Sequence, residues 1–149
     1  MGLVVNKLFD EIDFGELLSQ LEITPADLSP PLSIHFGGPV ESQRGFVLHT
    51  ADYTGKGTVA VDKQVALTAT LDILKELANG NGPRSTMLAL GYAGWGPGQL
   101  EAEISENAWL HAPFNEALVF DSDVDTKWQR AMNSIGVDPS SLSGVAGRA

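Results

Sequence analysis

Short apolar and β-branched runs between polar turns predict several strands along the chain. We expect strands at Leu3–Val5, Leu32–Phe36, Gly45–His49, Thr58–Val61, Val65–Thr68, Thr86–Tyr92 and Ala117–Phe120. The run Thr86–Tyr92 is apolar on both faces, which is typical of a buried central strand.

Four other segments repeat apolar residues at helical spacing. We expect helices over 14–22, about 71–78, about 97–107, and from Asp123 or Asp125 to Ile135. Asp13 is the predicted N-cap of the first, and Gly80 and Gly136 are predicted stops. The side chains expected to face inward on the second and the last of these helices are Leu71, Leu74, Leu77, Trp128, Met132 and Ile135.

The order of these elements favours an α+β fold. Strands occur as neighbouring pairs and also alternate with helices, so a mixed, mainly antiparallel sheet with about four flanking helices is expected. No repeat or linker divides the chain, which predicts a single domain over residues 1–149. The proline-rich segment 25–31 predicts a loop, and the small, polar tail 139–149 is expected to be loosely held.

Charge and composition narrow the function classes. The chain has a net charge of −10, and its nine lysine and arginine residues are scattered, which disfavours direct binding of DNA or RNA. Cysteine is absent, which excludes disulfides, thiol catalysis and cysteine-bound metals. With no apolar run long enough for a bilayer and no signal-peptide pattern at the start, a cytoplasmic location is expected.

The glycine-rich segment Gly91–Gln99 is the most unusual stretch of the sequence. It follows a predicted strand and opens a predicted helix, a geometry that exposes backbone N–H groups to an anion. It does not fit a phosphate-binding Walker loop, because no Lys-Ser or Lys-Thr follows the glycines. The alternative is a strained turn that needs positive φ, with Trp95 packed over it.

A second pair of glycines, Gly37 and Gly38, lies between two predicted strands. Adjacent glycines let a backbone approach a ligand closely, but they also serve in an ordinary turn or bulge. Both interpretations stay open at this point.

The histidines offer a weak catalytic hypothesis. His35 and His49 are expected on neighbouring strands, because a turn joins their segments, which makes a two-histidine site conceivable beside a purely structural role. His49 and Asp52 could supply a base and an orienting carboxylate. No metal-ligand spacing is present, so no metal and no cofactor are expected.

Acidic residues occur in two groups near predicted helices. Asp121, Asp123 and Asp125 lack the pattern of a calcium loop, so capping of the last helix is the better explanation. Glu101, Glu103 and Glu106 have no lysine partner at helical spacing, which predicts a solvated helix face.

Several motifs together resemble the AlgH/YqgE family of bacterial proteins. They cover the chain in order: Gly2–Lys7, Phe36–Val40, Gly45–Thr50, Leu90–Ile104, Asn107–Leu110 and Gly144–Gly147. The resemblance implies a cytosolic protein with an α+β fold and carries over no established catalytic residues. One branch of the family is labelled a transcriptional regulator of alginate synthesis.

The resemblance also implies that family members begin upstream, with an additional strand-containing segment before Gly2–Lys7. Without that strand the sheet would have an unpaired edge. We expect the printed chain either to be less stable than an upstream-extended one or to cover this edge by forming a homodimer.

The sequence therefore predicts a non-enzymatic protein that binds a small ligand or a protein partner and has a regulatory role. The alternatives are a hydrolase or metal-assisted enzyme that uses His49 and Asp52, and, with less support, a direct DNA-binding regulator. The candidate ligand-binding residues share the two glycine turns or lie near them in the sequence: Gly37, Gly38, Arg44, His49, Gly94, Trp95, Gly96 and Gln99.

Overall fold

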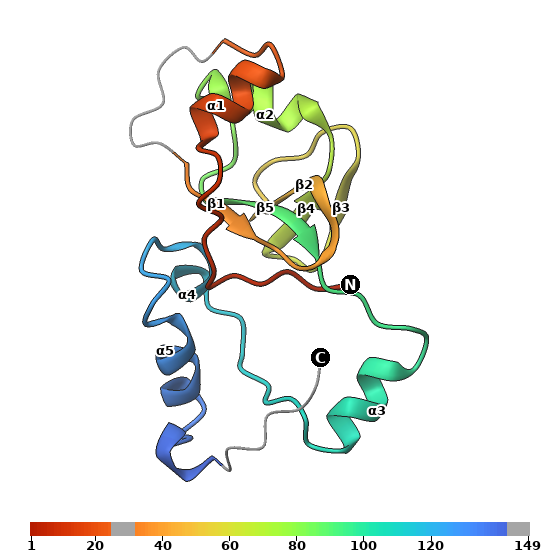
Figure 1. Cartoon of the computed structure of the whole chain (residues 1–149), viewed down its shortest axis with the longest axis vertical. Helices are drawn as coiled ribbons and strands as arrows, with labels where there is room; N and C mark the ends of the chain where they lie inside the picture. Colours follow the sequence, from red (N-terminus) through yellow and green to blue (C-terminus); the bar gives the residue numbers. More distant parts are fainter. Residues whose placement is uncertain (25–31, 143–149) are drawn as a thin grey trace. The chain divides into compact units, whose positions relative to one another are not determined.

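The computed structural model describes residues 1–24 and 32–142. Contacts group the chain into two compact units, an N-terminal unit, Gly2–Ala93, and a C-terminal unit, Gly94–Ala149 with Met1 (Figure 1). The expected loop 25–31 and the end of the tail, with Gly144–Gly147, lie outside the described residues. The expectation of one domain over the whole chain stays a prediction.

The N-terminal unit contains a five-stranded sheet in the order β1-β5-β2-β4-β3. Its strands are β1 (Ile34–Phe36), β2 (Val40–Thr50), β3 (Thr58–Ala60), β4 (Val65–Thr68) and β5 (Thr86–Tyr92). β1 and β5 pair in parallel, and the other three pairs are antiparallel. The α+β class with a mixed, mainly antiparallel sheet is confirmed.

Two helices, α1 (Phe14–Gln20) and α2 (Leu71–Ala78), lie side by side and share a hydrophobic core with one face of this sheet (Figure 1). Asp13 begins α1 as predicted, through a capping box with Glu16. The expected face of α2 is partly wrong, because Leu71 is 52% exposed. The buried residues of α2 are Ile73, Leu74 and Ala78.

The N-terminal segment runs along the outer edge of β1. The expected strand Leu3–Val5 is wrong as a regular strand, since the segment makes only isolated bridges, Gly2 with Ala93 and Leu8 with His35. The Phe9 amide donates to the Ile34 carbonyl at 2.9 Å, which helps to occupy this edge. The other sheet edge is β3, and a homodimer through an exposed edge stays a prediction.

β1 and β2 are consecutive in sequence but lie on opposite sides of β5. Residues 37–39 therefore carry the chain across the end of β5, backbone against backbone. A Cβ atom added to Gly37 or Gly91 would overlap the carbonyl oxygen of Gly91 or Gly38, respectively. These glycines permit the crossing because they have no side chain.

The C-terminal unit contains α3 (Gln99–Ser105), α4 (Glu116–Phe120), α5 (Lys127–Ser134) and a short 3-10 helix, Pro139–Ser141. The expected strand Ala117–Phe120 is wrong. Asn115 caps this segment as a helix by accepting a hydrogen bond from the Leu118 amide at 2.9 Å. The described residues thus contain five α-helices, and none of these has the length and apolar character needed to cross a membrane.

Candidate functional site

Two tryptophans in the C-terminal unit share one carboxylate. The indole N–H groups of Trp95 and Trp109 donate to Glu103 Oε2 at 3.0 and 2.7 Å. Gln99 Nε2 donates to the other oxygen, Oε1, at 2.9 Å. The two indoles meet edge to face, with ring centroids 5.7 Å apart. We call Trp95, Gln99, Glu103 and Trp109 the tryptophan platform.

The end of α3 directs Trp109 back toward Glu103. Asn107 has a φ of 59°. Its amide bonds to the Ile104 carbonyl, and the Ala108 amide bonds to the Glu103 carbonyl at 2.9 Å. This is the hydrogen-bond pattern of a Schellman motif, in which asparagine is one of the few residues that accept a left-handed conformation. The local sequence therefore closes the helix and reverses the chain just before the second tryptophan.

The glycine turn before α3 has its own internal partners. Gly98 is the N-cap of α3 and has a φ of 74°. This agrees with the alternative prediction of a turn that needs positive φ, which glycine adopts readily. The Gly96 amide donates to the side-chain oxygen of Gln99 at 3.0 Å, which satisfies one donor that an anion would need. Trp95 bonds to Glu103 rather than only covering the turn. The glycine turn thus positions Trp95 and Gln99 in the platform through its internal hydrogen bonds.

The electrostatics of the platform centre on Glu103. Hydrogen bonds from Trp109, then Gln99 and Trp95, hold the pKa of this carboxyl below its ordinary value of 4.5. All three donors are neutral N–H groups, so the carboxylate keeps its charge without a bonded cation. The expected solvated face is confirmed for Glu101 and Glu106, which are exposed, but is wrong for Glu103, which is half-buried.

We expect an acid titration of the tryptophan fluorescence to report this hydrogen bonding. Because the folded pKa is lowered, the carboxylate's contribution is complete above the ordinary pKa and is lost as the pH falls through the lowered value. In a Trp128→Phe background, which leaves only the two platform tryptophans, the midpoint should lie below 4.5. A midpoint at or above this value, or the same transition in Glu103→Gln, would contradict the assignment.

His49 lies in a chain of hydrogen bonds inside the N-terminal unit. Its side chain is fully buried; Nδ1 bonds to the Thr50 carbonyl at 2.8 Å and Nε2 to Thr68 Oγ1 at 2.9 Å. Thr68 in turn contacts Thr58 Oγ1 at 2.7 Å. Nδ1 must carry the proton, since its partner is a carbonyl. Both ring nitrogens are therefore occupied by neighbours in the sheet.

Asp52 does not orient His49. Its carboxylate accepts hydrogen bonds from the Thr50 hydroxyl and, at 2.9 Å, from the Arg84 amide. These two bonds, the Thr50 hydroxyl first, hold the pKa of Asp52 below its ordinary value. The predicted pair of a histidine base and an orienting carboxylate is not formed. Asp52 fastens the turn that leads into β5.

The prediction that His35 and His49 lie on neighbouring strands is also wrong. His35 aligns with Ala89 on one side of β5, and His49 aligns with Thr86 on the other. Side chains alternate between the two faces along a strand, and Ala89 and Thr86 are an odd number of residues apart in β5. The side chains of His35 and His49, which align with them, therefore point to opposite faces of the sheet. No group of three or more potential metal ligands occurs among residues 1–24 and 32–142.

Arg44 lies in an irregular part of β2 between Val40 and Gly45. It pairs with Glu41 at 3.1 Å, and its guanidinium lies 5.1 Å from the centre of the Phe46 ring. A mostly apolar pocket of about 260 Å³ opens beside this segment. Leucines of α1 and α2 line it together with parts of β2 and β5.

The sequence candidates therefore divide between the two units. Gly37, Gly38, Arg44 and His49 belong to the N-terminal unit, and Gly94, Trp95, Gly96 and Gln99 belong to the C-terminal unit. Within the second group, Trp95, Gly96 and Gln99 are joined by the hydrogen bonds of the tryptophan platform. Glu103 and Trp109 complete the platform but were not among the candidates.

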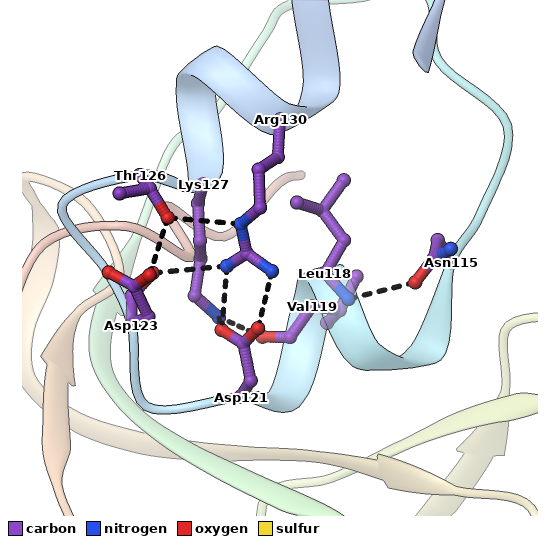
Figure 2. A network of polar contacts seen from close by, with 8 residues as sticks. All are labelled: Asn115, Leu118, Val119, Asp121, Asp123, Thr126, Lys127 and Arg130. Carbon is purple, nitrogen blue, oxygen red and sulfur yellow. Dashed lines mark hydrogen bonds and ion pairs between the residues drawn. The ribbon is translucent and has the colours of Figure 1, made fainter. Parts of the chain in front are cut away.

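A second polar network joins α4 to α5 (Figure 2). Asp121 accepts two hydrogen bonds from the Arg130 guanidinium and lies 3.6 Å from the Lys127 ammonium. Arg130 lowers the pKa of the Asp121 carboxyl, while burial lowers the pKa of Lys127. Asp123 bonds to the Thr126 hydroxyl at 2.6 Å.

This network corrects two expectations for the last helix. α5 begins at Lys127, and its N-cap is Thr126, so the expected capping by Asp123 or Asp125 is wrong. Met132 is buried as expected, but the other buried residue of α5 is Lys127, at 2% exposed, whereas Trp128 is 50% exposed. The carboxylate of Asp121 makes this burial tolerable, because a buried ammonium needs a counter-charge and hydrogen-bond partners.

Comparisons with known proteins agree with this fold. A family model described as DUF179, AlgH-like, matches residues 1–140. A UPF0301 protein of Rhodospirillum rubrum is 49% identical over the whole chain and 78% of its own length. One of Jannaschia sp. is 51% identical, over the whole chain and 79% of its own.

Solved structures give the same result. The solution structure of the AlgH protein from Pseudomonas aeruginosa matches with a TM-score of 0.77 and 39% identity, over the whole chain and 79% of that protein. A crystal structure of a Corynebacterium diphtheriae protein matches with a TM-score of 0.65 at 20% identity, over 88% and 69% of the two chains, and supports the fold alone. The chain belongs to the AlgH-like family.

Proposed function

We propose that this protein acts by binding a protein partner through the tryptophan platform, without catalysis of its own, and that this binding has a regulatory role. The observation that carries the proposal is the sharing of Glu103 by two indoles. The shared bonds fix the orientation of Trp95 and Trp109 while Trp109 remains 39% exposed. Rigid, exposed tryptophans are typical of binding hot spots.

The surroundings of the platform favour a protein over a small ligand. Among the described residues of the C-terminal unit, Met132 is the one hydrophobic core residue that is buried. Beside Trp109 in the sequence, the large apolar residues Leu110 and Phe114 are instead exposed. An exposed apolar segment of this kind, 109–114, is suited to contact with a second macromolecule.

The enzyme alternative has no comparable support. Both nitrogens of His49 bond to the sheet, and Asp52 bonds to the turn before β5, so neither is poised to act on a substrate. A direct DNA-binding role is disfavoured by the net charge of −10.

Photo-crosslinking in the native cells tests the proposal. A photoreactive residue at Leu110, which is 51% exposed, should give a defined protein adduct, and the adduct should disappear with Trp109→Ala. The matched control is the same photoreactive residue at Leu71, which is 52% exposed in the N-terminal unit. No adduct from Leu110, or the same adducts from both positions, would overturn the proposal.

A further inference from the structure

We infer that the segment bound by the tryptophan platform is cationic and presents arginine side chains to it. The inference rests on the proposed function, because it names the chemistry of the partner for the same surface. It is carried by two features, the distribution of charge along the C-terminal unit and the orientation of the two indoles.

All the charged residues in the stretch of sequence around the platform are acidic. Between Arg84 and Lys127 there is no lysine or arginine, whereas the acidic residues are Glu101, Glu103, Glu106, Glu116, Asp121, Asp123 and Asp125. Asp121 is compensated by Arg130 and Lys127. In the part of the chain that the structure describes, no lysine or arginine pairs with the three glutamates of α3 and its C-cap. Among residues 1–24 and 32–142, the negative charge at the platform is thus not paired with a lysine or arginine.

The orientation of the indoles adds a second feature that favours a cation. Each indole uses its N–H edge to bond Glu103, so the hydrogen-bonding edge of each ring is occupied within the platform. Because the rings meet edge to face, a partner can contact only the ring surface that this packing leaves, of which Trp109, 39% exposed, supplies a share. The face of tryptophan attracts cations most strongly among the aromatic side chains. A guanidinium can stack on such a face and bond a carboxylate with the same planar group.

The same charge argues against the other common partners of exposed tryptophans. Nucleic acids and anionic membrane surfaces would be repelled by the carboxylates of Glu101, Glu103 and Glu106 and by the net charge of −10. An arginine-bearing protein segment meets both features at once.

Isothermal titration of the full chain with a Gly-Arg repeat peptide tests the inference. The peptide should bind, and the same peptide with citrulline in place of arginine, which keeps the shape but not the charge, should not. Trp109→Ala should weaken binding by about tenfold or more, as truncation of a hot-spot residue does. Trp128→Ala removes a tryptophan outside the platform that is more exposed than Trp109, 50% against 39%, and should leave the affinity unchanged.

Three results would overturn the inference. The first is that the Gly-Arg peptide does not bind, and the second is that the citrulline peptide binds equally well. The third is an affinity for the Gly-Arg peptide that falls with salt but is the same in wild type and Trp109→Ala, which would indicate diffuse attraction to an acidic protein. Because the citrulline comparison uses the wild-type chain, a folding defect in a variant cannot mask the outcome. A platform-dependent crosslink at Leu110 together with no arginine-peptide binding would refute the cationic partner alone and leave the proposed function standing.

Discussion

Gly91→Ala is expected to destabilise the fold by about 3 kcal/mol or more, as measured by chemical denaturation. Two costs combine at this position. Gly91 has a φ of 72°, which is unfavourable for alanine, and the new methyl group would overlap the Gly38 carbonyl oxygen. The overlap is with backbone of the crossing segment 37–39, so it cannot be relieved by rotation of a side chain.

Gly80→Ala is the matched control for this prediction. Gly80 has a φ of 74° and ends α2, but nothing lies within 4 Å of the position of an added Cβ. Its cost should be about 1 kcal/mol, from the backbone conformation alone. Equal losses in the two variants would mean that the crossing at Gly37–Gly38 is not tightly packed, and would contradict the topology described above.

The second large effect is expected for Asp121→Asn, which should destabilise the C-terminal unit by about 3 kcal/mol. The substitution removes the counter-charge of Lys127, which is 2% exposed, and of Arg130 at the same time. Hydrogen exchange in α4 and α5 is the appropriate measurement, because it reports the stability of this unit separately.

Lys127→Met provides the comparison. It replaces the buried ammonium with an apolar side chain of similar length, and Asp121 keeps its two hydrogen bonds from Arg130. The loss should therefore be smaller, about 1 kcal/mol. The Lys127 ammonium also donates a hydrogen bond to the Val119 carbonyl. A loss as large as that of Asp121→Asn would show that this bond, rather than the shared carboxylate, holds the two helices together.

Local signals in the sequence were sufficient for part of the fold. The strands Val65–Thr68 and Thr86–Tyr92 and the helix Leu71–Ala78 have the predicted bounds. In each case an uninterrupted pattern of apolar residues ends at a turn or a glycine, so the information lies within the segment.

Errors arose where a distant residue or a short segment decided the outcome. Ala117–Phe120 is a run of four residues, a length that fits either a strand or a helix turn, and the Asn115 cap decides between them. The burial of Lys127 depends on Asp121, which belongs to another element. The separation of His35 from His49 depends on β5, whose insertion between β1 and β2 is a property of the whole sheet.

The candidate site was predicted in part for the same reason. Trp95 and Gln99 stood out because the glycine-rich segment around them is unusual. Glu103 was assigned to a solvated face because it has no lysine partner at helical spacing, a rule that does not consider tryptophan donors before and after the helix. The signal that could have revealed the platform was Asn107, a residue suited to reversing the chain at the end of a helix.

Recognition of a cationic segment by the tryptophan platform can be tested directly by nuclear magnetic resonance. The full chain is labelled with the heavy nitrogen isotope, so that the indole N–H signals are observed. The protein has three tryptophans and therefore three indole N–H signals, which Trp→Phe variants would assign. On addition of the Gly-Arg peptide, the account predicts that the signals of Trp95 and Trp109 move together in a saturable way while that of Trp128 stays in place. Movement of the Trp128 signal instead, or no movement of any indole signal at saturating peptide, would contradict it.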